Sequence, residues 1–214
     1  MKPRLAGGPA QAGGNSDIDI SRRMFLQTCA IAPMASMAVA SPGALAQAAA
    51  DMRPTPACGN DDHPTPRQTE GPFYKPLSPK RATLLEAGIA GHKLVITGLV
   101  VSTRCRPLQG VVLDFWQADS EGHYDNTGFK LRGHQLTDTL GRYRLETILP
   151  GSYPGRTRHV HVKVAAPGQR VLTTQLYFPG EARNAADALF DSRLQVYVDR
   201  SLDRPARFDF VLNA

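Results

Sequence analysis

The sequence predicts an all-β fold, a sandwich of two sheets with few short helices. Short runs of β-branched or alternating apolar residues recur along the chain, and turn-forming pairs such as Pro150-Gly151 and Pro167-Gly168 separate them. Only residues 81–87 and 185–190 read as helical turns. Strands separated by such turn signals are typical of a sandwich.

The predicted strands are short runs of alternating or β-branched residues. They lie at 92–102, 111–117, 142–148, 159–165, 171–178 and 207–212. Because the side chains of a strand alternate between its two faces, each run can bury one face in a shared core.

The beginning of the chain is predicted to be an export signal. Residues 1–46 hold the paired Arg22 and Arg23, a short run of weak hydrophobes and the small residues Ala44-Leu45-Ala46, and they resemble a twin-arginine signal that a peptidase removes. The alternative is a membrane anchor, but spanning a bilayer needs about twenty apolar residues. This run is shorter and is broken by Pro33. We therefore expect export, to the periplasm, with no stable membrane anchor after cleavage.

The mature chain is expected to have an arm and a body. Residues 47–68 are rich in proline and should lie extended over the surface, and residues 69–214 should form the sandwich. Cys58 and Cys105 are the cysteines that remain after the signal is removed. An oxidising compartment would let them form a disulfide. Two free buried thiols are the alternative, because the sequence does not give the distance between their Cα atoms.

The charge of the chain excludes one class of function. The chain has 214 residues and a formal net charge of +6, but beyond the export signal its basic residues are scattered, without the runs of five or six or the interleaved aromatic residues of nucleic-acid-binding proteins. A core of this size needs no metal ion in order to fold. A metal in this protein would therefore serve chemistry.

The first chemical signal is His159-Val160-His161 in a predicted strand. Two histidines two residues apart project to the same face and can share one metal ion. The alternative is a solvent-facing polar row. Just upstream, a loop rich in proline and glycine carries Tyr153 and Arg156 to the start of the histidine strand. By itself, a tyrosine such as Tyr153 would more often be a packing residue at the edge of the sandwich.

Further motifs surround these residues in a fixed order. They are Thr69-Glu70-Gly71-Pro72-Phe73-Tyr74, Cys105-Arg106-Pro107-Leu108, Trp116-Gln117-Ala118-Asp119, Tyr124, Gly141-Arg142-Tyr143, Pro150-Gly151, Tyr153-Pro154, His159-Val160-His161 and Thr174-Gln175-Leu176-Tyr177-Phe178. Together they resemble the intradiol ring-cleavage dioxygenases, ferric enzymes that open catechols between the two hydroxyl groups. The resemblance runs from Thr69 to Leu212 and implies a prealbumin-like β-sandwich.

The resemblance also implies an Fe(III) cofactor with four protein ligands, Tyr124, Tyr153, His159 and His161. Ferric iron is a hard, highly charged ion that prefers anionic oxygen donors, and it can hold tyrosine as phenolate. By the family pattern, Tyr153 leaves the metal when the catechol binds and acts as a base. Two histidines with a carboxylate would instead indicate ferrous chemistry, but no Asp or Glu is spaced to complete such a triad.

Two more residues of the family's site map onto Arg156 and Gln175. The resemblance assigns both to the stabilisation of negative charge that develops during the reaction. Arg158 lies closer to His159 in the sequence. The arginine that faces the substrate is therefore left open between Arg156 and Arg158.

The resemblance implies a catecholic small molecule and O2 as reactants and a cis,cis-muconate type diacid as product. Thr69, Pro72 and Phe73 either line the mouth of the substrate site or only pack around it. Two other functions stay open: a non-catalytic, prealbumin-like binding module, and a dioxygenase-like protein that binds a metal or a catechol without turning it over. The sequence leaves the individual catechol and the formation of a homo-oligomer undecided.

Overall fold

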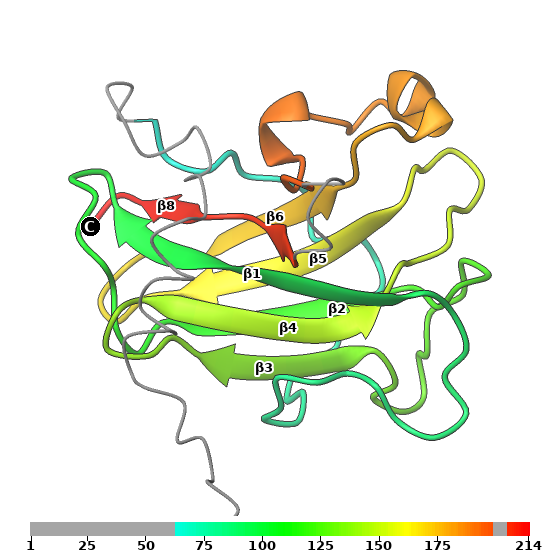
Figure 1. Ribbon diagram of the computed structural model, residues 1–214, viewed down its shortest axis with the longest axis horizontal. Helices are drawn as coiled ribbons and strands as arrows, with labels where there is room; N and C mark the ends of the chain where they lie inside the picture. Colours follow the sequence, from blue (N-terminus) through cyan, green and yellow to red (C-terminus); the bar gives the residue numbers. More distant parts are fainter. Residues whose placement is uncertain (1–62, 199–204) are drawn as a thin grey trace, which may run out of the picture. The chain divides into compact units, whose positions relative to one another are not determined.

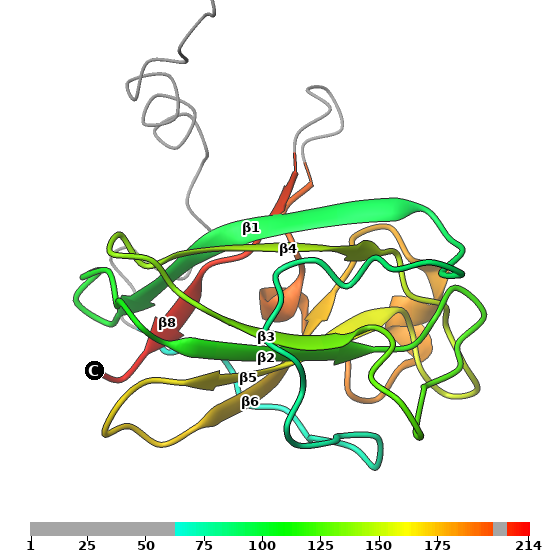
Figure 2. The same cartoon turned by 90° about the horizontal axis from the view of Figure 1, so that it is seen from below.

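Two four-stranded sheets lie face to face with a hydrophobic core between them (Figures 1 and 2). This computed structural model describes residues 63–198 and 205–214. One sheet contains β1 (Lys93–Ser102), β4 (Arg142–Ile148), β7 (Ala206–Arg207) and β8 (Phe210–Leu212), and the other contains β2 (Val112–Gln117), β3 (Arg132–Leu136), β5 (His159–Ala165) and β6 (Leu172–Tyr177). The described helical elements are the short 3-10 turns η1 (Ala182–Ala186) and η2 (Ser192–Leu194). The predicted all-β sandwich with few short helices is confirmed.

Part of the predicted organisation lies outside the described residues. This holds for the signal at residues 1–46, for most of the arm at residues 47–68 and for Cys58. Within residues 63–198 and 205–214, no helix combines the length and the apolar character that a membrane span requires.

The two sheets differ in their pairing. In the first sheet, β1 pairs antiparallel with β4 and parallel with β7 and β8, so the last strands of the chain lie beside the first. Antiparallel pairing gives the second sheet the order β3-β2-β5-β6. Its register aligns His161 of β5 with Trp116 of β2 and with Gln175 of β6. Because directly paired residues point to the same side of a sheet, these three side chains share one face.

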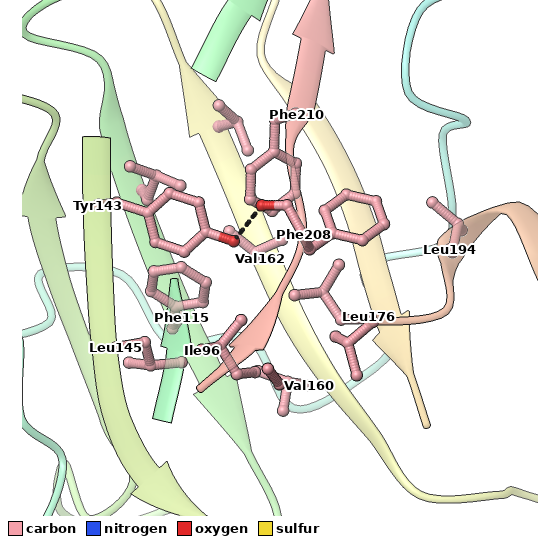
Figure 3. Packing of buried hydrophobic residues seen from close by; sticks show 14 of the residues in the cluster. Ile96, Phe115, Tyr143, Leu145, Val160, Val162, Leu176, Leu194, Phe208 and Phe210 are labelled. Atoms are coloured by element: carbon pink, nitrogen blue, oxygen red, sulfur yellow. Dashed lines mark hydrogen bonds between the residues drawn. The ribbon is translucent and has the colours of Figure 1, made fainter. Parts of the chain in front are cut away.

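The core takes alternate residues from both sheets. Val160 and Val162 of β5 face the aromatic residues Phe208 and Phe210 across the core (Figure 3). The hydroxyl of Tyr143 donates a hydrogen bond to the backbone carbonyl of Phe208 at 2.8 Å (Figure 3). Since the valines of β5 occupy the core face of the strand, its histidines lie on the opposite, outer face.

Three elements differ from the prediction. Strand β3 (Arg132–Leu136) is absent from the sequence-based prediction because its residues are mainly polar and show no apolar alternation. The helical turn predicted at 81–87 is wrong: this segment is extended and joins the edges of the two sheets through bridges to β3 and β4. Its apolar residues pack against the core from the side, as Leu84 does without any exposure. The turn predicted at 185–190 begins earlier, as η1.

The described beginning of the chain crosses the outer face of the second sheet (Figure 2). The backbone N–H of Gln68 donates to the carbonyl of Thr173 at 2.8 Å, and that of Thr65 donates to Val211 at 2.9 Å. Farther along, Lys163 of β5 forms an ion pair with Glu70. This crossing segment, residues 63–80, therefore covers the face of the sheet that carries the histidines.

Gly98 in β1 allows the segment before β8 to approach the first sheet. A Cβ atom at this position would lie 1.7 Å from the carbonyl oxygen of Phe208, far inside van der Waals contact. We expect Gly98→Ala to lower the free energy of unfolding by about 3 kcal/mol, because the backbone near Phe208 must move. Thermal unfolding measures the change. Leu99→Ala, at the half-buried neighbouring position, is the control and should cost about 1 kcal/mol. Equal costs for the two variants would contradict this steric account.

Candidate active site

Strand β5 places two histidines on its outer face, beneath the crossing segment. His159 and His161 are 2% and 1% exposed, which excludes the alternative of a solvent-facing polar row. The indole of Trp116 stacks on the His161 ring, with the centroids 4.7 Å apart and an angle of 9° between the planes. The histidines are therefore enclosed, and one of them is held flat against a neighbouring aromatic ring.

Two tyrosines reach the histidines from loops that touch each other. The backbone N–H of Gly151 donates to the carbonyl of Asp119 at 2.6 Å. A Cβ atom on Gly151 would lie 2.4 Å from the backbone nitrogen of Gly122, so this approach needs a residue without a side chain. It brings the rings of Tyr124 and Tyr153 into an edge-to-face contact, with the centroids 6.0 Å apart.

The structure brings together the four side chains that the resemblance identifies as metal ligands. Nε2 of His159 lies 3.1 Å from Nε2 of His161. The same nitrogen is 3.4 Å from the hydroxyl oxygen of Tyr124 and 3.5 Å from that of Tyr153. Two imidazole nitrogens and two phenol oxygens therefore converge at one point on the outer face of β5.

The orientation of His159 is fixed from behind. Its Nδ1 lies 2.7 Å from the backbone carbonyl oxygen of Thr157. A carbonyl oxygen can only accept a hydrogen bond, so Nδ1 carries the proton and Nε2 presents a lone pair toward the tyrosines. This is the arrangement of a metal-binding histidine, whose second nitrogen is bonded to a backbone carbonyl.

Burial controls the protonation of these side chains. It lowers the pKa of His159 to about 4, and the positive charge of Arg156 acts in the same direction. Burial, together with His159 and nearby arginines, holds the pKa of His161 well below its usual value. Both imidazoles are therefore neutral at pH 7. Burial, reinforced by Tyr153, raises the pKa of Tyr124. The Tyr124 phenol thus keeps its proton unless a cation compensates the negative charge.

This donor set fits a hard, highly charged cation. Within residues 63–198 and 205–214, His, Cys, Asp and Glu form no group of three that could hold a metal ion. The oxygen atoms that lie closest to Nε2 of His159 belong instead to the phenols of Tyr124 and Tyr153. A strongly charged cation would favour loss of the phenol protons and gain anionic oxygen donors. Two phenols and two neutral imidazoles suit the ferric iron that the resemblance implies.

Arg156 and Gln175 meet beside this point, whereas Arg158 does not take part. The Nη2 group of Arg156 donates to the side-chain oxygen of Gln175. The amide nitrogen of Gln175 in turn donates to the backbone carbonyl of Thr69 at 2.9 Å. Arg158 forms an ion pair with Glu181 at 3.2 Å. Of the two arginines, Arg156 is the one in contact with the predicted site residues.

The three predicted mouth residues lie along the crossing segment. Phe73 stacks on the ring of Tyr124, with the centroids 4.4 Å apart. Thr69 and Pro72 are exposed beside it. A cavity of about 580 Å³ is lined by Tyr124 together with Ile89 and Leu131 among others. Phe73 therefore packs against a predicted ligand, while Thr69 and Pro72 border solvent.

The family of the chain follows from its sequence as well as from this geometry. A family model described as dioxygenase matches residues 69–213. The chain belongs to the dioxygenase family. The match covers all of the predicted site residues, from Thr69 to Gln175.

Individual dioxygenases resemble the chain to different extents. The solved dioxygenase domain of a dioxygenase carbohydrate-binding protein fusion from the cellulolytic bacterium Streptomyces sp. SirexAA-E is 55% identical; the match covers 71% of this chain and 99% of that one, with a TM-score of 0.67. Catechol 1,2-dioxygenase of Acinetobacter baylyi is 30% identical over 64% of this chain and 54% of its own length. The protocatechuate 3,4-dioxygenase beta chain of Burkholderia cepacia is 32% identical over 53% and 56%, respectively. The chain spans about half the length of these two curated relatives.

Sequence reasoning missed two contributions to this dioxygenase site. Thr157 acts through its backbone carbonyl, which no side-chain motif can reveal. Asp187 binds Arg156 from a turn far along the chain, and no spacing rule links the two. Trp116 is buried on the outer face of the second sheet, where it stacks on His161. Cys105 is disulfide-bonded, while its predicted partner Cys58 lies outside the described residues.

The ligand set can be tested at Tyr124. We expect Tyr124→Phe to retain less iron after reconstitution with ferric ions and to alter the visible colour, because one of the converging oxygens is removed. Metal analysis and the visible spectrum measure both effects. Tyr197→Phe is the matched control, since Tyr197 is 44% exposed on the segment before β7 and should change neither. Wild-type iron content and spectrum in Tyr124→Phe would remove this residue from the ligand set.

Proposed function

We propose that this protein is an intradiol ring-cleavage dioxygenase, in which Tyr124, Tyr153, His159 and His161 hold Fe(III). The observation that carries the proposal is the convergence of two phenol oxygens and two imidazole nitrogens on the outer face of β5. Two relatives of the chain support the reaction class, because they are named as a catechol 1,2-dioxygenase and a protocatechuate 3,4-dioxygenase beta chain.

The proposed reaction joins a catechol with one O2 and breaks the ring bond between the two hydroxyl-bearing carbons. Both oxygen atoms end in the product, a cis,cis-muconate type diacid, so the balance requires no further reductant. Bound ferric iron would supply the redox-active centre that chelates the deprotonated catechol and makes it reactive toward O2. The protein's own groups bind and orient the ring and move its protons.

Tyr153 is the residue we assign to proton transfer. Its hydroxyl oxygen lies 3.5 Å from His159 Nε2, at the edge of the converging donors, and its side chain is only partly buried. It sits on a loop, whereas the histidines are fixed in the middle of a sheet. A phenolate at this position can accept a proton from a catechol hydroxyl at its Oη atom.

Arg156 and Gln175 are assigned to the negative charge that develops on the ring and on the oxygen atoms. Arg156 is half-buried and presents a permanent positive charge, which is strengthened where water is excluded. Gln175 is fully buried and bonded to both Arg156 and the crossing segment. These hydrogen bonds fix the guanidinium of Arg156 and the amide of Gln175 in place, so neither group needs to reorganise when negative charge develops.

The first test is the visible spectrum and iron content of the purified protein, before and after anaerobic addition of catechol, followed by admission of O2. We expect a tyrosinate-to-iron absorption band that shifts with catechol, then equimolar O2 uptake and formation of the diacid. A protein that stays colourless after ferric loading would contradict the proposal and leave a non-catalytic binding module. A shifted band without O2 uptake would leave a protein that binds catechol without turning it over.

We also propose that the protein is a single-domain, exported member of its family, carried to the periplasm by the paired Arg22 and Arg23. The disulfide at Cys105 supports an oxidising compartment.

Export can be tested by changing the arginine pair. In a bacterium with a twin-arginine pathway, the wild-type chain should appear shortened in the periplasmic fraction. Replacing both residues, Arg22→Lys with Arg23→Lys, should leave the full-length chain in the cytoplasm, because receptors of this pathway read the pair itself. Arg4→Lys, outside the pair, is the control. Undiminished export of the double variant would refute the assignment.

A further inference from the structure

A buried carboxylate stands behind Arg156. We propose that Asp187 is a positioning residue, which holds the guanidinium of Arg156 in the orientation that the reaction uses. The side chain of Asp187 is 1% exposed and that of Arg156 is 15% exposed. The inference rests on the proposed function, because it concerns a residue of that same site.

Both oxygen atoms of the Asp187 carboxylate accept hydrogen bonds. Nε of Arg156 lies 3.2 Å from Oδ1 and 3.0 Å from Oδ2. The backbone N–H of Thr157 donates to Oδ2 at 2.9 Å, and that of Leu189 donates to Oδ1 at 2.9 Å. Burial by itself would raise the pKa of Asp187, but these hydrogen bonds and Arg156 hold it below its usual value. The carboxylate is therefore anionic and fixed.

Asp187 contacts Arg156 at Nε, so the Nη2 group at the far end of the guanidinium can bind other partners. Nη2 of Arg156 donates to the side-chain oxygen of Gln175 and lies 3.5 Å from the hydroxyl oxygen of Tyr177. A guanidinium is planar, with its donors at fixed angles, so an acceptor at Nε sets where the terminal groups point. Asp187 thus aims these groups toward Gln175 and the outer face of β5.

A turn of the chain is organised to present Asp187. The residue follows η1 directly, and its backbone N–H bonds to the carbonyl of Asn184. The side-chain oxygen of Asn184 accepts a hydrogen bond from the hydroxyl of Thr157 at 2.8 Å, and its amide nitrogen donates to the carbonyl of Phe178 at 2.9 Å. The turn is therefore tied to the end of β6 and to the residue after Arg156.

Stability alone explains this ion pair poorly. Removing two charges from water often costs as much as their attraction returns, and apolar side chains of similar size can be as stable. A pre-aimed cation is valuable where negative charge develops during a reaction, because it costs no reorganisation at that moment. Asp187 and Arg156 lie at such a place, beside the converging phenols and imidazoles.

The test begins with Asp187→Asn, which keeps the shape of the side chain. Each oxygen of Asp187 accepts a backbone N–H, so the amide nitrogen of asparagine must face one of these donors. Arg156 Nε then loses one of its two oxygen acceptors and the negative charge that holds it. We expect kcat to fall about tenfold while KM stays within about twofold, because Arg156 acts on charge that develops after binding. Iron content and the visible band should not change.

A double-mutant cycle separates positioning from general structural support. If Asp187 acts through Arg156, the change Asp187→Asn should alter kcat less than about twofold in the Arg156→Ala background. Any structural cost of the asparagine persists in both backgrounds, and the melting temperature reports it separately. The matched control is Asp138→Asn: Asp138 also binds two backbone N–H groups and an arginine Nε, but in the loop between β3 and β4. Its kcat should equal that of wild type.

Three results would overturn the proposal. An equal loss of kcat in both backgrounds would show that Asp187 acts independently of Arg156. Loss of iron or of the visible band in Asp187→Asn would show that its effect passes through Thr157 to His159. Full kcat in Asp187→Asn would show that Arg156 needs no such partner. Absence of O2 uptake in the wild-type protein would be a different result. It would contradict the proposed function itself, without any comparison of variants.

Discussion

The alternation of β5 is the constraint on which the rest of the structure depends. Val160 and Val162 must enter the core, so His159 and His161 must leave it by the opposite face. In a β-sandwich without a covering segment, this outer face of the sheet would be exposed to solvent. Here the crossing segment and Trp116 cover it, and the resulting burial makes both imidazoles neutral. Strand β5 therefore contributes valines to the hydrophobic core from one face and two of the four predicted ligands from the other.

The site is consequently built outside the hydrophobic core rather than within it. Its polar side chains are anchored to backbone groups and to each other, as Gln175 is to the carbonyl of Thr69 and Asp187 is to the N–H groups of Thr157 and Leu189. Buried polar groups satisfied in this way add specificity of orientation. The core between the sheets is a separate cluster of aliphatic and aromatic side chains (Figure 3).

The fold class could be predicted because its signals are local, whereas Tyr124 and Tyr153 were singled out only by the resemblance of the whole domain to a family. Alternating runs indicated the strands, and the spacing of His159 and His161 placed both on one face. Strand β3 was hidden because polar residues such as Arg132 and Gln135 are buried there by tertiary contacts. The segment at 81–87 has helix-like apolar spacing, yet its backbone bonds to the edges of two sheets. No local sequence pattern marks Asp187, because folding alone brings it next to its partner Arg156.

The path of the crossing segment also has a consequence for the order of events during folding. Thr65 bonds to Val211 and Gln68 to Thr173, so the cover over the histidines closes only when the two ends of the domain have met. Contacts between residues so distant in sequence carry a large loop-closure cost and are expected to form late. Uptake of the proposed ferric ion should therefore mark the completed domain.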